Sequence, residues 1–139
     1  MKNRIITGCG AILAGLLIAL GPQYLFKLCG PAQDGHWMAC HWTGRAEIGV
    51  GCLIAALGVG LILFPAVRTR LGLSVAILLA GILALLLPSI LIGGCAMETM
   101  ACRRVSFPAI TVIGTLTIVG AALNAFLLFR RGEREGTRA

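Results

Sequence analysis

Residues 71–92 read LGLSVAILLAGILALLLPSILI, and this uninterrupted apolar stretch decides the fold class. It carries no charged side chain over 22 residues, and a helix of that length rises about 33 Å. The hydrocarbon core of a bilayer is about 30 Å thick, so the stretch predicts one membrane-spanning helix. A strand of a membrane β-barrel would instead be shorter and would alternate in polarity.

Three further stretches have the same character and raise the predicted number of transmembrane helices to four: Ile5–Phe26, Glu47–Val67 and Phe107–Phe129. The chain of 139 residues is 58% hydrophobic and 12% charged, about half the charged content of a soluble domain. Despite a net charge of +7, this composition excludes a soluble enzyme, a disordered chain and a nucleic-acid-binding module. We expect an all-α membrane protein in which residues 1–139 form a single four-helix domain.

The basic residues are divided unequally between the two sides of the predicted bundle. Four lie in the loops over about residues 27–46 and 93–106, and eight lie beside the termini or the second connection. These eight are Lys2, Arg4, Arg68, Arg70, Arg130, Arg131, Arg134 and Arg138. Because basic residues concentrate on the cytoplasmic side of a membrane, we expect both termini in the cytoplasm, with a charged tail over residues 132–139.

The two halves of the chain resemble each other in the spacing of small residues, prolines and cysteines. At an offset of 66 residues, the matched positions are Leu13-Ala14-Gly15 with Leu79-Ala80-Gly81, Pro22 with Pro88, and Cys29 with Cys95. At an offset of 62 residues, they are Met38-Ala39-Cys40 with Met100-Ala101-Cys102, and Gly58 with Gly120. The pattern predicts two tandem helical-hairpin repeats over residues 5–70 and 71–131, related by an axis along the membrane normal.

Small residues and prolines within these repeats predict how the helices meet. Glycines allow helix backbones to approach closely in a membrane, and the candidates for such contacts are Gly15, Gly58, Gly81 and Gly120. Pro22 and Pro88 are expected to kink the first and third helices near the outer face, because each removes a backbone hydrogen bond.

Six cysteines divide into four in the outer loops and two within the spans. The loop cysteines are Cys29, Cys40, Cys95 and Cys102. In an oxidising outer compartment we expect them to form structural disulfides. The repeat favours one bridge in each hairpin, Cys29–Cys40 and Cys95–Cys102, although four cysteines allow three connectivities. Cys9 and Cys52 are expected to pack against neighbouring helices as small apolar residues.

Two other uses of the outer loops remain open. The first is a copper or haem site, for which the candidate ligands are His36, Met38, His41, Met97 and Met100. The second is thiol–disulfide exchange, since the layout resembles that of bacterial quinone-linked disulfide-forming membrane oxidases. Those enzymes use a Cys-x-x-Cys pair, whereas the loop cysteines here are 11 and 7 positions apart.

Two polar residues in or beside the predicted spans are candidates for a functional role. Glu47 opens the second span, where a carboxylate stabilises a helix N-terminus and can pair with Arg45 or Lys27. Asn124 lies within the last span, where an amide typically hydrogen-bonds to a neighbouring helix. A proton relay through Glu47 and a polar path along Asn124 are the alternatives.

The stretch Met38-Ala-Cys40-His41-Trp42-Thr43-Gly-Arg-Ala46-Glu47-Ile-Gly49 resembles the signature of a family of small, uncharacterised bacterial membrane proteins. Members of that family resemble this chain in length, in the four-span layout and in the paired loop cysteines. The resemblance implies a location in the bacterial cytoplasmic membrane and implies no activity.

Taken together, these features predict a non-enzymatic accessory or assembly subunit of a larger, transporter-type membrane complex, with the outer loops as its contact surface. We expect the bilayer and either such a complex or a second copy of the chain as partners, and no cofactor or nucleic acid.

Overall fold

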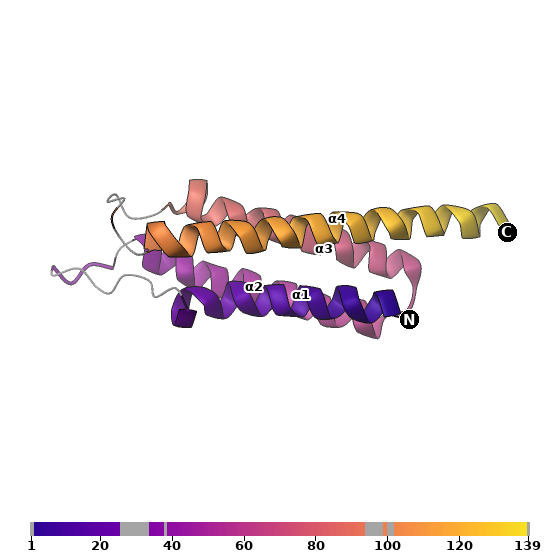
Figure 1. The fold of residues 1–139 in the computed structure, drawn as a ribbon, viewed down its shortest axis with the longest axis horizontal. Helices are drawn as coiled ribbons and strands as arrows, with labels where there is room; N and C mark the ends of the chain where they lie inside the picture. The colour runs from indigo at the N-terminus through magenta and orange to yellow at the C-terminus, as the bar shows by residue number, and fades with distance from the viewer. Residues whose placement is uncertain (1, 26–33, 38, 94–98, 100–101, 139) are drawn as a thin grey trace.

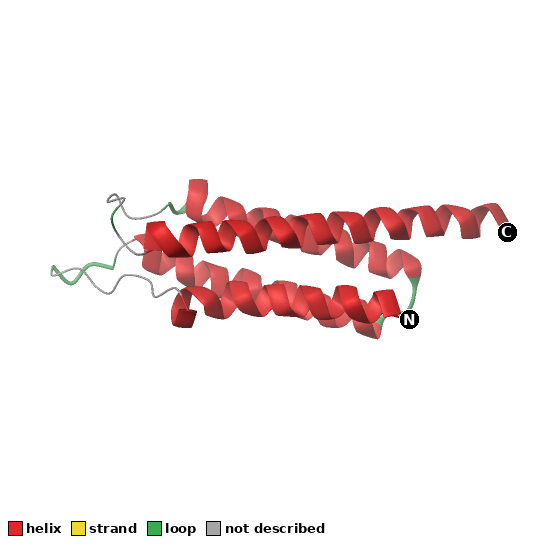
Figure 2. Ribbon diagram, in the orientation of Figure 1, coloured by secondary structure: helices red, strands yellow, loops and turns green. Residues whose placement is uncertain are grey.

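The computed structural model describes residues 2–25, 34–37, 39–93, 99 and 102–138. Four long helices form an elongated bundle (Figure 1), namely α1 (Lys2–Leu20), α2 (Ala39–Leu63), α3 (Val67–Leu86) and α4 (Phe107–Arg138). No β-strand occurs within these described ranges (Figure 2). All four helices are long and apolar enough to cross a membrane, so the prediction of a multi-pass, all-helical membrane protein is confirmed.

Both termini lie at the same end of the bundle (Figure 1), which we call the terminal end. The opposite end, which we call the loop end, carries short π-helical turns, η1 (Gly21–Leu25) after α1 and η2 (Leu87–Leu91) after α3. A third π-helical turn, η3 (Cys102–Ser106), precedes α4.

The prolines account for the first two π-helical turns. Pro22 and Pro88 are each the second residue of their turn. Proline has no N–H and its ring displaces the carbonyl four residues earlier, and the wider π-helical turn accommodates both effects. In η2 the resulting bond joins the Ile92 N–H to the Leu87 carbonyl at 3.0 Å. The kinks expected from the sequence therefore take the form of π-helical turns.

The second helix differs from the prediction at both of its ends. α2 begins at Ala39 rather than at Glu47, and it ends at Leu63 rather than at Val67. It stops early because Pro65 disfavours the helical conformation in the residue before it. Glu47 consequently lies two turns inside the helix and is not at its N-terminus.

Two basic segments predicted as connection and tail are helical as well. Arg68 and Arg70 lie in the first turn of α3, which begins at Val67, and so the connection before it is shorter than predicted. α4 continues from Phe107 to Arg138 without interruption, so the predicted tail extends the last helix.

α1 and α2 pack backbone against backbone through glycines. A Cβ atom added at Gly15 would lie 2.6 Å from the backbone nitrogen of Ala55 and from the carbonyl oxygen of Gly51. One added at Gly51 would lie 2.5 Å from the backbone nitrogen of Ala19. Such distances are far below van der Waals contact, so any larger residue would push the two helices apart.

The other glycines expected at helix contacts fall into two groups. Gly58 packs against α1, and Gly81 packs against α4 opposite Gly114. Gly120 differs from the expectation: it is exposed, and a Cβ atom there would meet nothing within 4 Å. Gly120 therefore faces open space, whereas the other three glycines lie in helix contacts.

Cys9 and Cys52 also differ from the prediction. Both are exposed on the surface of the bundle instead of packing between helices. The neighbouring glycines, Gly8 and Gly51, occupy the contact positions between α1 and α2. Successive residues of a helix point about 100° apart, so the two cysteines face outward.

Candidate functional site

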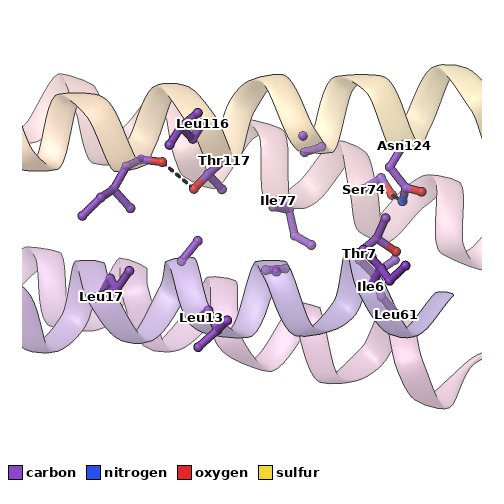
Figure 3. A pocket seen from close by; sticks show the side chains of 16 residues that line it. Ile6, Thr7, Leu13, Leu17, Leu61, Ser74, Ile77, Leu116, Thr117 and Asn124 are labelled. Atoms are coloured by element: carbon purple, nitrogen blue, oxygen red, sulfur yellow. Dashed lines mark hydrogen bonds between the residues drawn. The ribbon is translucent and has the colours of Figure 1, made fainter. Parts of the chain in front are cut away.

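A cleft of about 430 Å³ separates α1 from α4 (Figure 3). Its two walls are lined by Ile6, Thr7, Gly10, Ala11, Leu13, Ala14 and Leu17 of α1 and by Ile113, Leu116, Thr117, Gly120, Ala121 and Asn124 of α4. Leu61 of α2 and Ser74 and Ile77 of α3 complete the lining. The walls are almost entirely apolar, and the volume is typical of a site for a small ligand, roughly 300–1,000 Å³.

The cleft opens sideways, toward the surface that faces lipid in a membrane. Leu13 on one wall is 63% exposed and Leu116 on the other is 67% exposed. From Ile6 to Leu17 the α1 wall is about 16 Å long, which is close to half the thickness of a bilayer core of about 30 Å. The cleft therefore extends over a length of about half a bilayer core along α1 and α4.

The end of the cleft nearest the termini is polar. Asn124 and Ser74 lie there together with Thr7 (Figure 3). The Asn124 Nδ2 donates a 2.7 Å hydrogen bond to the Ser74 Oγ, which in turn donates a 2.9 Å bond to the Arg70 carbonyl. The Asn124 Oδ1 is buried and accepts no hydrogen bond from the described residues. This acceptor can take a donor from a ligand in the cleft.

The threonines that line the cleft leave oxygen acceptors in it. Thr7 Oγ1 donates a 2.8 Å bond to the Asn3 carbonyl, and Thr117 Oγ1 donates a 2.7 Å bond to the Ile113 carbonyl. Each hydroxyl donates its proton to a carbonyl of its own helix, so the lone pairs of its oxygen remain available as acceptors. The polar groups of the cleft thus favour a ligand that donates hydrogen bonds.

Glu47 forms a second, closed polar site toward the loop end. Its side chain is 0% exposed, and neither carboxylate oxygen has a hydrogen-bond partner in the described part of the chain. The expected pairing with Arg45 is absent because Arg45 is exposed, and Lys27 lies outside the described residues. The expected role as a helix cap is wrong because α2 begins two turns earlier. A buried carboxylate without a partner is costly in a membrane and marks a candidate functional position.

One turn before Glu47, Thr43 is buried on the same face of α2. Its hydroxyl donates a 3.0 Å bond to the Gly93 carbonyl, just after η2. This bond ties α2 to the end of the third span, so the surroundings of Glu47 are fixed by packing. Glu47 does not line the cleft, so the two positions are separate.

The outer-loop predictions lie mostly outside the described residues. This applies to Cys29, Cys95, Met38, Met97 and Met100. Of Cys40 and Cys102 the structure describes the backbone alone. The disulfide pairing and the methionine ligands therefore stay predictions.

The two histidines of the first outer loop can be placed. His36 is exposed, and His41 stacks on Trp37 with ring centroids 4.2 Å apart. Among the residues that the structure describes, no three His, Cys, Asp or Glu side chains come together as a metal site.

Comparison with known proteins identifies the family of the chain. No curated protein and no solved structure matches it. A family model described as a domain of unknown function matches residues 11–127, which include the greater part of the cleft. On this match, the chain belongs to the DUF4418 family.

Proposed function

We propose that the protein is a non-enzymatic accessory protein of the bacterial cytoplasmic membrane that holds the hydrophobic chain of a membrane lipid between α1 and α4. The observation that carries the proposal is the cleft itself, which is apolar, open toward lipid and polar at one end. A cavity of this kind in a bilayer is filled by the surrounding hydrocarbon, and an immobilised chain contributes packing that an empty cavity lacks.

The dimensions of the cleft favour a single chain over a partner helix. A helix about 16 Å long and about 10–12 Å across occupies roughly 1,300–1,800 Å³, well above the cleft volume of about 430 Å³. A helix with its side chains is about 10–12 Å across, so it would not enter without separating α1 from α4. An extended alkyl chain is narrow enough to enter.

We extend the proposal to the organisation of the chain. The helices form two hairpin repeats with both termini in the cytoplasm and disulfide-stapled outer loops. The repeat is supported by η1 and η2, which begin 66 residues apart and carry their prolines at the same place. The orientation is supported by the basic residues, eight of which belong to the end where both termini lie.

A cleft-blocking variant tests the proposal. We would purify the full-length protein in mild detergent and count bound lipids by native mass spectrometry. The wild-type chain should carry about one tightly held lipid, and Gly120→Phe should lose it, because the new ring enters the cleft from a position where nothing lies within 4 Å.

Gly72→Phe is the matched control. Gly72 is also exposed with nothing within 4 Å, but it does not line the cleft, so this variant should keep the lipid. A Gly120→Phe protein that retains lipid as the wild type does would contradict the proposal.

A further inference from the structure

We propose that the terminal end of the cleft binds the phosphate group of an anionic membrane lipid through Arg70, with Arg4 and Arg131 beside it. The inference rests on the proposed function and names the class of lipid that the cleft selects.

Arg70 carries the argument because it is buried without an acceptor. Its side chain is 6% exposed, and its Nε and Nη2 are buried and have no hydrogen-bond partner among the described residues. Arg70 lies one helical turn before Ser74 on the same face of α3, and its own carbonyl accepts the Ser74 hydroxyl. Arg70 does not line the cleft itself, but it continues the face of α3 that carries Ser74 by one turn toward the terminal end.

Two further arginines lie on the two wall helices toward the terminal end, Arg4 on α1 and Arg131 on α4. The charges of Arg4 and Arg131 both act on Arg70 and repel it. Arg4 lies one turn before Thr7 on α1, and its Nε is likewise buried without an acceptor. Arg131 lies two turns after Asn124 on α4, beyond the last buried residue of that helix, and its side chain is exposed. An anionic ligand beside Arg70 would relieve this repulsion and supply the acceptor that its buried N–H groups lack.

The preferred anion is a phosphate group attached to a hydrocarbon chain. A guanidinium presents N–H donors in a planar fork that matches two phosphate oxygens. A chain lying in the cleft places its headgroup at the end where Arg70 is located. The free Asn124 Oδ1 accepts a hydroxyl proton, so a glycerol headgroup suits the site. Anionic lipids are abundant on the side where basic residues concentrate.

The experiment measures binding of two lipids to the full-length protein in detergent micelles. The probes are phosphatidylglycerol, which is anionic, and phosphatidylcholine, which carries a phosphate but no net charge. Wild-type protein should prefer phosphatidylglycerol. Arg70→Gln should lower the affinity for that lipid about tenfold, because charge-assisted hydrogen bonds are lost. Arg68→Gln removes the same charge from an exposed position in the same turn of α3 and should change binding less than twofold.

Arg70→Lys and the melting temperature distinguish the loss of a lipid site from a loss of fold. Lysine keeps the charge and loses the fork, so its affinity for phosphatidylglycerol should fall between those of the wild type and Arg70→Gln. Without added lipid, Arg70→Gln should melt no lower than the wild type, since it removes a buried charge that lacks an acceptor. Lower melting with unchanged lipid preference would overturn the inference and make Arg70 structural.

The source of the phosphate is tested with soluble glycerol phosphate. If it displaces phosphatidylglycerol at equal concentration, the site binds a free anion and the lipid assignment is wrong. Equal effects of Arg68→Gln and Arg70→Gln would also overturn it. If Gly120→Phe removes both lipids while Arg70→Gln leaves binding unchanged, the cleft proposal stands and this inference fails. If Gly120→Phe retains both lipids, the proposed function itself fails.

Discussion

The two hairpins meet the same packing problem with different residues. In the α1–α2 pair, Gly8 lies against Ile62, and a Cβ atom at Gly8 would come within 2.3 Å of the Ile62 Cγ1. At the offsets of 66 and 62, the matched positions in the α3–α4 pair are Ser74 and Asn124, which are hydrogen-bonded at 2.7 Å. One hairpin is closed by an apolar contact, and the other by a polar pair.

A second matched pair shows a similar contrast. Gly58 lies in the α1–α2 contact, where an added Cβ atom would be 2.9 Å from the backbone nitrogen of Ile12. Its counterpart Gly120 faces the open cleft and meets nothing. The first hairpin is thus tightly closed by glycines, while the second turns one glycine and one amide toward a ligand-sized space. At this matched pair, a glycine in a membrane helix thus marks a helix contact in the first hairpin and an opening in the second.

The largest effect that sharpens this comparison is expected at Gly15. Gly15→Ala places a methyl group 2.6 Å from backbone atoms that cannot move independently, so α1 and α2 must separate. We expect a loss of about 3 kcal/mol in the free energy of unfolding, at the upper end of overpacking costs. Unfolding in mixed micelles, followed by circular dichroism, measures it.

Gly120→Ala is the matched control for that measurement. The new methyl group enters open space, so the free energy of unfolding should change by less than about 0.5 kcal/mol. Equal losses in the two variants would show that the contrast between the closed and the open interface is wrong.

The sequence predicts the four helices well because the bilayer imposes length and apolarity on each of them. It predicts their faces poorly for the same reason: helices that are apolar all round carry no polarity contrast between the buried and the lipid-facing side. The cysteines at positions 9 and 52 were therefore expected inside the bundle and lie outside it. Only the opposing residue across the interface decides this, and the sequence does not say which residue that is.

The cleft was not predicted from the sequence, for a different reason. Asn124 was a candidate because an amide is unusual in an apolar span, and that signal is real. The burial of Arg70 was missed because a count of basic residues predicts the side of the membrane and not the direction of a side chain. Its position four residues before Ser74, on a helix that starts earlier than predicted, is the signal that would have placed it.

A smaller effect is expected where the tight interface encloses an ionisable side chain. Glu47 lies one turn from Gly51 on the same face of α2, without a hydrogen-bond partner in the described residues. Glu47→Met keeps the length of the side chain and removes the unpartnered carboxylate, so the free energy of unfolding should rise by about 1–2 kcal/mol. Chemical unfolding in micelles tests this, with the exposed Glu133→Met as a control that should change nothing. A loss of stability at Glu47 would mean that the carboxylate has a partner in the membrane.

The smallest effect is expected when the second hairpin is given the contact found in the first. Ser74→Gly with Asn124→Ile reproduces the Gly8–Ile62 contact at the matched positions. Each single variant should lose up to about 1 kcal/mol, because interhelical hydrogen bonds in membranes contribute roughly 0.6 kcal/mol on average. The double variant should recover part of that loss, since the isoleucine packs against the glycine and no unpaired polar group remains. A double-mutant cycle measures the coupling between positions 74 and 124. Strictly additive losses would show that this pair is not equivalent to the Gly8–Ile62 contact. The double variant also removes the Asn124 Oδ1 acceptor from the cleft. Lipid binding by this variant therefore separates the packing role of the pair from its role at the end of the cleft.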